Sequence, residues 1–456
     1  MAVDYARLAR DGASPEQLAE AFISDYYSGQ TPSIPVNPFA ILRDMGIVFS
    51  FRNFSNYEGI YIPAESDGDV PVVGINANRP VTRQRYTASH ELCHHIKDAD
   101  TGYMCSIASD NDIERYAEAF AAALLMPTSL FREQVDEYKV NGFVSFESAL
   151  RIADYFGVSF AACLNRLAFD FHVIEGDVTG AALRQRRNEF GPMAHRAELG
   201  LSDVPLYRQL YDASEPFLRV EPSPQMRQVF ETEYVFHDSR MEGVTVDREL
   251  AAEIVVDLRL NGSQSKFYSE ENQNIIEVAG LASAYDWVFR NATPDRPLVI
   301  YDATEINRLL FSAAKHPEFG GALRQANTLV LGGKFETVDY RRVAEEMHFK
   351  GKEIDTFVAN SDSLPASEYL ERVLDIHHDL TVVHPFRDGN GRSLRAFANL
   401  MFLRRGLPPV LFSDETKDLY KDALAKADET GNRDALYELY YKEMLKAHAI
   451  FTDSLL

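Results

Sequence analysis

The feature that most constrains this chain is one short stretch, residues 384–395, which reads His-Pro-Phe-Arg-Asp-Gly-Asn-Gly-Arg-Ser-Leu-Arg. Its histidine, His384, titrates near neutral pH and can take a proton from a hydroxyl group. Asp388 follows four residues later and offers a hard oxygen ligand of the kind that Mg²⁺ shares with substrate phosphates. A general base and a candidate magnesium ligand are therefore close neighbours in the sequence.

The rest of this stretch is suited to bind an anion. Gly389, Asn390 and Gly391 allow backbone N–H groups to approach an anion closely. Arg392 and Arg395 lie on one side of the helix that is predicted to begin here, and a helix N-terminus itself favours phosphate. The combination indicates a site that moves a phosphate-containing group. The alternative is a Gly-Asn turn before an arginine-rich surface helix.

The stretch resembles the signature of the Fic (filamentation induced by cAMP) family, His-x-Phe-x-Asp/Glu-Gly-Asn-Gly-Arg-x-x-Arg, and every fixed position matches. The resemblance implies a protein adenylyltransferase that uses ATP and Mg²⁺ to place AMP on a Ser, Thr or Tyr hydroxyl of an unknown target protein. It makes His384 the base, Asp388 the metal ligand and residues 389–391 the phosphate nest, while Arg392 stabilises the departing pyrophosphate. Related sites transfer other phosphate-containing groups or remove AMP, so these reactions remain alternatives.

Composition limits the class of protein. The chain has 456 residues, a hydrophobic content of 46% and a formal net charge of −23, which predict two or three domains with real cores. The acidic charge argues against broad binding to nucleic acid or to anionic membranes. The three cysteines form no paired framework, and we find no signal peptide and no apolar run long enough to span a membrane. We expect a cytoplasmic, bacterial protein.

Residues 1–170 are expected to form a first domain of the α+β class. The spacing of apolar residues and the turn signals predict helices at 14–28 and 38–45. Three short apolar runs, bounded by Gly, Pro and Asp, predict a small sheet over residues 47–51, 59–63 and 70–75.

A second motif with chemical meaning follows the predicted sheet. His90 and His94 are four residues apart, so both imidazoles share one face of a helix and can bind one ion. Glu91 lies next to His90 and can reach water bound to that ion as a general base. A third ligand is needed, and the apolar helix predicted over 113–127 offers two acids, Glu114 and Glu118.

The region around this motif resembles the ImmA/IrrE metallopeptidase family over residues 35–130. The likeness covers the polar lead-in, the His-Glu-x-x-His helix and a glutamate-containing helix that ends in Leu-Leu-Met-Pro. It implies a zinc site, and counting back from that ending places the third ligand on Glu114, although Glu118 stays possible. Cys93 stands where the family usually has glycine, so its thiol is either inert packing or a redox-sensitive neighbour. Domains of this type either cleave a protein substrate or act as sensors.

The remaining chain is expected to hold a connecting region, 171–225, and an all-α Fic domain, 226–456. Helical spacing of apolar residues predicts a bundle over residues 248–258, 270–290, 304–314, 366–383, 392–405 and 414–446. Residues 323–333 are predicted to form a β-hairpin. The resemblance to Fic proteins makes this hairpin a flap that pairs with the extended backbone of the target.

A control element is expected at the start of this second domain. Residues 237–243, His-Asp-Ser-Arg-Met-Glu-Gly, resemble the Fic inhibitory motif, Ser/Thr-x-x-x-Glu-Gly/Asn, with Glu242 as its glutamate. The resemblance implies that Glu242 pairs with Arg395 and takes the place of the ATP γ-phosphate. Asp238 replaces the usual Ser or Thr. Its side chain can cap the following helix, and it also adds a second negative charge, which would make the block stronger or shift its position.

The sequence thus predicts a zinc metallopeptidase-like domain fused to an autoinhibited Fic adenylyltransferase. A competing hypothesis makes the protein a stress, toxin–antitoxin or phage-defence regulator. In that case the zinc domain senses or cleaves a partner, and the Fic domain is the controlled effector.

Overall fold

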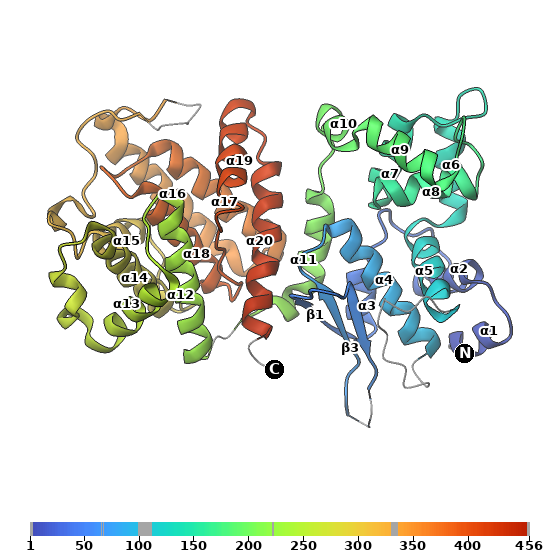
Figure 1. Cartoon of the computed structure of the whole chain (residues 1–456), viewed down its shortest axis with the longest axis horizontal. Helices are drawn as coiled ribbons and strands as arrows, with labels where there is room; N and C mark the ends of the chain where they lie inside the picture. Colours follow the sequence, from blue (N-terminus) through green and yellow to red (C-terminus); the bar gives the residue numbers. More distant parts are fainter. Residues whose placement is uncertain are drawn as a thin grey trace. The chain divides into compact units, whose positions relative to one another are not determined.

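A computed structural model gives the fold of the chain (Figure 1). It describes residues 3–64, 66, 68–98, 112–220, 223–329 and 336–453. The chain divides into two compact units, Met1–Phe217 and Leu218–Leu456. Among the residues described, no helix combines the length and the apolar character needed to cross a lipid bilayer.

Helix starts in the first unit follow from local capping. α2 (Pro15–Tyr26) begins with a reciprocal cap, in which the Ser14 hydroxyl accepts from Gln17 N and the Gln17 side chain accepts from Ser14 N. α3 (Pro38–Asp44) also has proline in its first position, where the missing N–H costs nothing. Both helices confirm the sequence-based prediction.

A three-stranded sheet follows, made of β1 (Val48–Arg52), β2 (Gly59–Ile62) and β3 (Val72–Asn76). The strand order is β1-β3-β2, with β3 parallel to β1 and antiparallel to β2. Apolar residues alternate along β1, so that Phe49 and Phe51 are buried. The small sheet was predicted from its apolar runs, and it forms.

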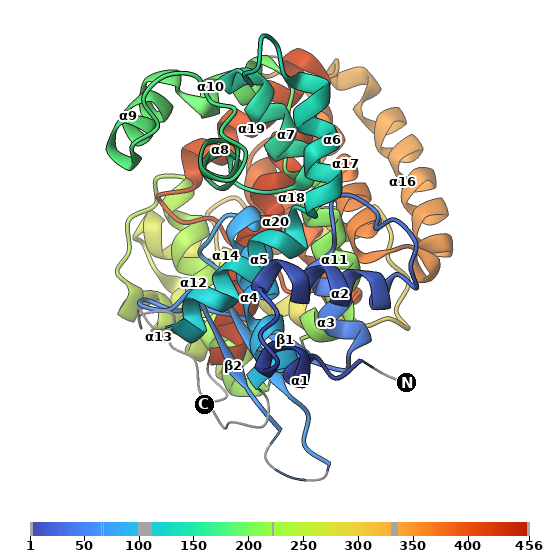
Figure 2. The same cartoon turned by 90° about the vertical axis from the view of Figure 1, so that its right-hand side faces the viewer.

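The sheet packs against α4 (Val81–Asp98), which in turn packs against α5 (Asp112–Leu125). α2 and α5 lie side by side (Figure 2). α4 is buried along most of its length although its sequence is polar, and this unusual burial of polar side chains marks it as the helix that carries a site. The short α1 (Tyr5–Arg10) also contacts α4.

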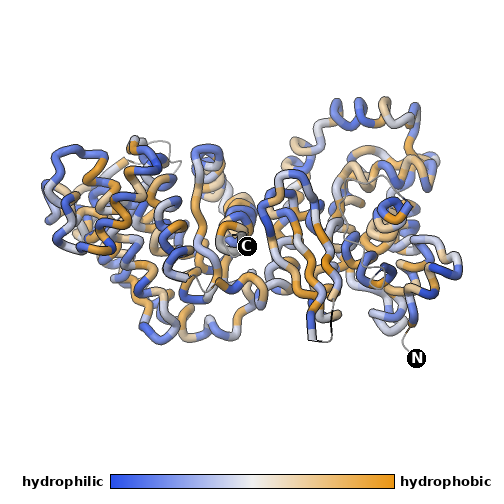
Figure 3. Tube along the Cα trace, turned by 60° about the horizontal axis from the view of Figure 1, so that its bottom comes forward, coloured by the Kyte–Doolittle hydropathy of each residue, from blue (hydrophilic) through white to orange (hydrophobic). Residues whose placement is uncertain are grey.

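A further group of helices completes the first unit around its own apolar cluster. Its core includes Phe131, Leu150, Phe156, Leu164 and Leu167. The helices that supply or cover it are α6 (Thr128–Tyr138), α7 (Phe146–Phe156), α8 (Phe160–Phe169) and α9 (Gly180–Phe190), followed along the chain by α10 (Pro192–Glu198) and α11 (Val204–Leu218). Figure 3 shows apolar and polar residues alternating along these helices, as amphipathic helices require.

The structure differs from the expected connecting region at 171–225. The described part of that region folds into α9, α10 and α11, and residues up to Phe217 belong to the first unit. The reason is burial: Tyr207, Leu210 and Tyr211 of α11 are inaccessible to solvent. Gly180, Gly191 and Pro192 lie at the ends of short helices rather than in a solvated linker.

The second unit is helical, as predicted, and its helices surround α18 (Asn390–Arg404). Almost every residue of α18 from Arg392 to Phe402 is buried, and the helix packs against three others. These are α14 (Gln273–Asn291), α15 (Tyr301–Leu310) and α17 (Ala366–Val383). The remaining helices are α12 (Pro224–Met241), α13 (Arg248–Asn261), α16 (Val343–Asn360), α19 (Lys417–Thr430) and α20 (Asp434–Asp453).

Three helical details differ from prediction. α12 has weak apolar periodicity, and neither α12 nor α16 was predicted. The helical run predicted at 414–446 is two helices, because Gly431 adopts a left-handed conformation and ends α19.

The predicted flap hairpin is only partly covered, since residues 330–335 lie outside the described residues. Leu323 forms an isolated antiparallel bridge with Phe386. The hydroxyl of Thr337, which lies beyond the predicted hairpin, donates to Thr328 O. The hairpin itself stays a prediction.

The contact between α14 and α15 gives a test of this packing. A Cβ atom on Gly280 would lie 1.9 Å from the carbonyl oxygen of Leu310, which is backbone and cannot rotate away. We expect Gly280→Ala to lower the free energy of unfolding by roughly 1–3 kcal/mol, the usual cost of overpacking. Gly180→Ala is the control, because a Cβ there meets nothing within 4 Å. Equal urea midpoints for Gly280→Ala and wild type would contradict the close helix contact.

Candidate active site and candidate metal centre

The first unit brings two histidines and one glutamate together. His90 Nε2 lies 3.1 Å from Glu114 Oε2 and 3.1 Å from His94 Nε2. One ligand atom from each residue lies within 4.8 Å of the others, and all three residues are buried. Glu118 is exposed on the outer face of α5. The geometry therefore favours Glu114 over Glu118, the alternative that the sequence left open.

Helix geometry explains this meeting. His90 and His94 are one turn apart on α4, so both rings face α5. Glu114 stands in the first turn of α5, where its carboxylate reaches the two imidazoles. The alanines farther along α5, Ala117 and Ala121, are buried, and small side chains of this kind allow a close approach of the two helices.

Glu91 lies in the same buried region, and neither of its carboxylate oxygens has a hydrogen-bond partner among the described residues. Burial raises the pKa of Glu91, and the nearby Glu114 carboxylate raises it further. A Cβ atom on Gly59 of β2 would lie 2.8 Å from Glu91 Oε1, so the sheet leaves room for this carboxylate only where the strand has glycine. Two buried acids beside two imidazoles fit a cation, which would supply the missing positive charge.

Asp98 and Cys93 lie near this cluster on α4. Asp98 Oδ2 lies 3.0 Å from His94 Nδ1, so it holds the ring nitrogen that faces away from the cluster. Sequence reasoning missed Asp98, although its position one turn after His94 is a readable signal.

Cys93 is fully buried, and burial raises the pKa of its thiol well above the ordinary value. The thiol is therefore protonated and packs as a small apolar group. This favours inert packing over the alternative of a redox-sensitive neighbour.

The second unit places the 384–395 stretch at the junction of α17 and α18. His384 ends α17 in a left-handed backbone conformation, with φ of 49°. Asn390 closes the following loop, because its side chain accepts from Phe386 N and donates to Phe386 O. Gly389 begins α18 with a positive φ of 73°, and a Cβ there would lie 2.6 Å from a side-chain carbon of Leu310.

The side chains of this loop differ in exposure. His384 is half-buried, and burial together with the charge of Arg324 lowers its pKa. A neutral imidazole is the form that can accept a proton. The Asp388 side chain is exposed, with Oδ1 accepting from Gly389 N at 2.6 Å. Its second oxygen can therefore be offered to a metal ion without unfolding the loop.

Both arginines of the stretch are paired with carboxylates from other helices. Arg392 Nη1 donates to Glu277 Oε2 of α14 at 2.9 Å. Arg395 Nε donates to Asp238 Oδ1 at 2.6 Å, and its Nη2 donates to Glu242 Oε1 at 2.7 Å. The pair that the inhibitory-motif resemblance implied, Glu242 with Arg395, is thus present as a contact. The pairing of Glu277 was not foreseen, since nothing in its sequence context distinguishes it from a surface acid.

Of the two expectations for Asp238, the helix cap is wrong, whereas the second negative charge beside the arginine is present. Asp238 lies inside α12 and is buried against Arg395, so it caps no helix. The helix that follows, α13, is capped instead by Asp247, whose carboxylate accepts from Leu250 N. The physical reason is the length of α12, which runs through the motif and ends at Glu242.

The Glu242 carboxylate lies at the start of α18, where a phosphate is expected. A Cβ atom on Gly391 would lie 3.0 Å from Glu242 Oε1 and 2.8 Å from Arg395 Nη1. Burial opposes ionisation of Glu242, but the Arg395 guanidinium outweighs it and lowers the pKa of Glu242. A negative charge is therefore already present at a helix N-terminus that attracts anions.

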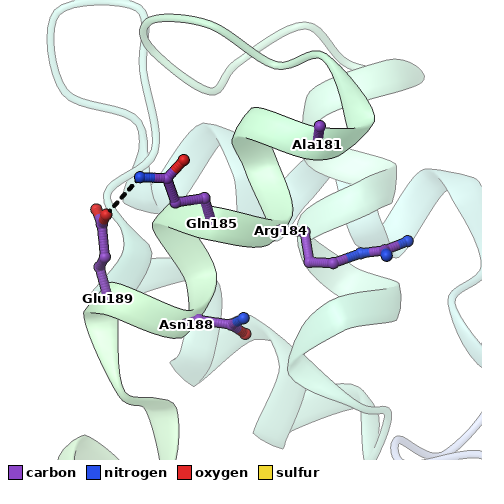
Figure 4. Close-up of a pocket in the computed structure, with 5 residues that line it drawn as sticks. All are labelled: Ala181, Arg184, Gln185, Asn188 and Glu189. Carbon is purple, nitrogen blue, oxygen red and sulfur yellow. Dashed lines mark hydrogen bonds between the residues drawn. The ribbon is translucent and has the colours of Figure 1, made fainter.

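A separate hollow lies along α9 and is shown in Figure 4. It is lined by Ala181, Arg184, Gln185, Asn188 and Glu189, all from this one helix. Gln185 donates to Glu189 at 2.8 Å, and Figure 4 shows this bond along the helix surface. The hollow contains none of the candidate catalytic or metal-binding residues.

Comparison with known proteins identifies two domains. Residues 42–168 match the model described as IrrE N-terminal-like domain, Peptidase_M78, and residues 297–402 match the Fic/DOC family model. A protein adenylyltransferase, fic-1, from Caenorhabditis elegans is 28% identical over 231 residues, which cover 50% of this chain and 43% of that protein. A protein adenylyltransferase Fic from Nematostella vectensis is 27% identical over 201 residues, or 43% of each chain. The chain thus spans less than half the length of these curated relatives.

Solved structures give matches of the same kind. Fic-1 (aa134 - 508) from C. elegans aligns with a TM-score of 0.44 and 19% identity, covering 81% of this chain and 98% of that one. A Fic domain containing signaling protein from Bacteroides thetaiotaomicron aligns with a TM-score of 0.42 and 17% identity, covering 55% and 97%. On the two family-model matches alone, the chain carries an IrrE N-terminal-like domain within residues 42–168 and a Fic/DOC family domain within residues 297–402.

Proposed function

We propose that the second unit is a protein adenylyltransferase that moves AMP from ATP to a hydroxyl group of a Ser, Thr or Tyr on a target protein. The observation that carries the proposal is the junction of α17 and α18. There a neutral histidine, an exposed aspartate and two arginines gather at a glycine-rich helix N-terminus. The C. elegans and N. vectensis relatives, named as protein adenylyltransferases, support the same reaction.

Each residue has a defined task in this reaction. His384 takes the proton from the target hydroxyl, whose oxygen then forms a bond to the α-phosphorus of ATP. The bond from that phosphorus to the bridging oxygen breaks, and pyrophosphate leaves. The backbone of residues 389–391 holds phosphate oxygens, and Arg392 balances the charge that develops on the pyrophosphate. Asp388 would hold Mg²⁺, which when bound supplies positive charge to the phosphates.

Glu242 is proposed to inhibit this site. Its carboxylate occupies Arg395 and lies beside Gly391, so an ATP γ-phosphate that approaches the same arginine meets a like charge. ATP that binds despite this repulsion has its α-phosphate out of line for attack. The Glu242 side chain is 38% exposed and stands at the end of α12, so it can leave without unfolding that helix.

For the first unit we propose a zinc site held by His90, His94 and Glu114. The fit rests on three buried ligand atoms that converge and on the unpaired carboxylate of Glu91 beside them. Zinc, when bound, supplies a Lewis acid and lowers the pKa of bound water. Glu91 is placed to take a proton from such a water, and Asp98 holds His94 in the orientation that points Nε2 at the ion. One function that this arrangement supports is cleavage of a protein substrate by a peptidase.

A second candidate function makes the first unit a sensor within a stress or defence regulator whose effector is the Fic domain. The observation that favours it is the burial of the metal centre: Glu91 is 0% exposed and His94 is 1% exposed. A catalytic zinc must admit substrate, whereas a structural or sensing ion does not. We propose a cytoplasmic location for either function, supported by the two buried free cysteines.

The zinc proposal is tested by metal content and by a matched pair of acids on α5. The purified protein should contain about one zinc per chain. Glu114→Gln and His94→Ala should each lose it, because each removes a ligand, whereas Glu118→Gln should retain it. Glu91→Gln should keep the metal and lose any peptidase activity. Elemental analysis that finds full zinc in Glu114→Gln would assign the third ligand elsewhere.

The base is tested with labelled ATP. His384→Ala should reduce AMP transfer by roughly 10²- to 10⁴-fold, because it removes the proton acceptor and little packing. His348→Ala is the control, since His348 is an exposed histidine on α16. The measurement is incorporation of label from α-labelled ATP into the protein itself or into a lysate. Undiminished incorporation by His384→Ala would exclude it as the base.

The inhibition is tested in the same assay. Glu242→Gly should raise AMP transfer by about 5- to 150-fold, the range of a typical coupling free energy, and Glu242→Gly with His384→Ala should be inactive. Glu270→Gly serves as the control, because Glu270 is an exposed glutamate before α14. If wild type and Glu242→Gly transfer AMP equally at saturating ATP and Mg²⁺, Glu242 does not inhibit.

A further inference from the structure

Arg324 is a buried cation whose side-chain hydrogen bonds end on main-chain carbonyl oxygens. Its Nε donates to His384 O at 2.7 Å, and its Nη1 donates to Ala326 O at 3.0 Å. Its Nη2 donates to Val383 O at 3.3 Å and to Val338 O. The residue is 5% exposed. A single guanidinium therefore joins the end of α17 to Ala326 and to Val338.

The backbone of the same residue adds a second attachment. Arg324 N donates to Pro385 O at 2.9 Å, and the neighbouring Leu323 forms the antiparallel bridge with Phe386. The segment that begins at Leu323 thus pairs with the loop that follows His384. Side-chain and main-chain bonds together fix one segment relative to the other.

His384 needs such support, because its backbone is in the left-handed region. With φ of 49° and ψ of 61°, a non-glycine residue is strained and holds this conformation only where its surroundings impose it. Arg324 binds the carbonyl oxygen of this very residue, and a bond from a charged donor is stronger than one from a neutral donor. The imidazole is therefore placed by a backbone that Arg324 holds.

The charge of Arg324 acts on the imidazole as well. Burial is the first cause of the lowered pKa of His384, and the Arg324 guanidinium is the second. The Thr381 carbonyl and the Asp388 carboxylate act in the opposite direction. Arg324 therefore favours the neutral imidazole, which is the form that takes up a proton.

We propose that Arg324 is a positioning residue that holds the backbone of His384 and fixes it relative to the segment that begins at Leu323. The proposal rests on the proposed function of His384 as the base. An imidazole whose backbone is held in this way meets the target hydroxyl in a set orientation, which is what an oriented proton transfer requires.

The test uses Arg324→Met and Arg324→Lys in the Glu242→Gly protein, with Arg404→Met as the matched control. Arg404 also donates to main-chain carbonyls, those of Thr293 and Arg296, but lies outside the site. The measurements are kcat and KM for ATP, the pH dependence of kcat, thermal unfolding, and NMR titration of the His384 ring assigned with His384→Ala.

For Arg324→Met we expect kcat to fall by up to about 10²-fold, the effect of a small misplacement of reacting groups. KM for ATP should change by less than about twofold, because Arg324 contacts neither Arg392 nor Arg395 in the described hydrogen bonds. Loss of the positive charge should raise the pKa of His384, so the acid limb of the pH profile moves to higher pH. Arg324→Lys keeps the charge but not the planar set of donors, so it should lower kcat and leave the His384 pKa nearly unchanged.

The inference is overturned if Arg324→Met leaves kcat and the His384 titration unchanged. It is also overturned if Arg404→Met lowers kcat as much, since the effect would then be general destabilisation. If Arg324→Met does not fold, the kcat of Arg324→Lys tests the inference, and a kcat equal to that of the parent protein overturns it. NMR titration needs no AMP transfer, so a shifted His384 pKa without any transfer by the parent protein would refute the proposed reaction and support this inference.

Discussion

The second unit depends on keeping a buried arginine paired. Arg395 is 4% exposed, and an isolated charge at such a depth is strongly destabilising. Asp238 and Glu242 compensate it from one face of α12, one helical turn apart. This ion pairing ties α12 to α18, the most buried helix of the unit. It also fixes the guanidinium beside Gly391, at the helix N-terminus where an anion is attracted.

The first unit also buries charge that must be compensated, but there the buried charge is negative. Glu91 and Glu114 are buried carboxyl groups that face two imidazoles rather than an arginine. Hydrogen bonding within the cluster satisfies Glu114 in part but leaves Glu91 unpaired. In the second unit, protein side chains supply the missing charge, whereas in the first unit the residues fit an added cation. Both candidate sites are therefore places where burial of charge had to be balanced.

The sequence predicted those parts of the sites whose geometry is local. His90 with His94, and Arg392 with Arg395, meet because helical spacing decides which residues share a face. Glu277, Asp238 and Arg324 could not be predicted in their roles, because their partners lie far away in the chain. The contact from Arg324 to His384, for example, depends on how residues 323–326 fold back onto the end of α17. Weak periodicity likewise hid α12, because its buried residues include polar ones, Glu231, Thr232 and Asp238.

The two carboxylates on Arg395 differ in a way that matters for control. Asp238 lies inside α12 with a side chain that is 4% exposed, so it can move away only if the helix unwinds. Glu242 stands at the helix end and is 38% exposed, so it can rotate into solvent. If Glu242 were the sole partner, its departure would leave a buried guanidinium uncompensated. Because Asp238 stays bound to Nε, Arg395 remains paired and oriented while Nη2 becomes free for a phosphate oxygen. In the proposed inhibition, the Asp in place of the usual Ser or Thr would therefore lower the cost of releasing Glu242 without releasing the arginine.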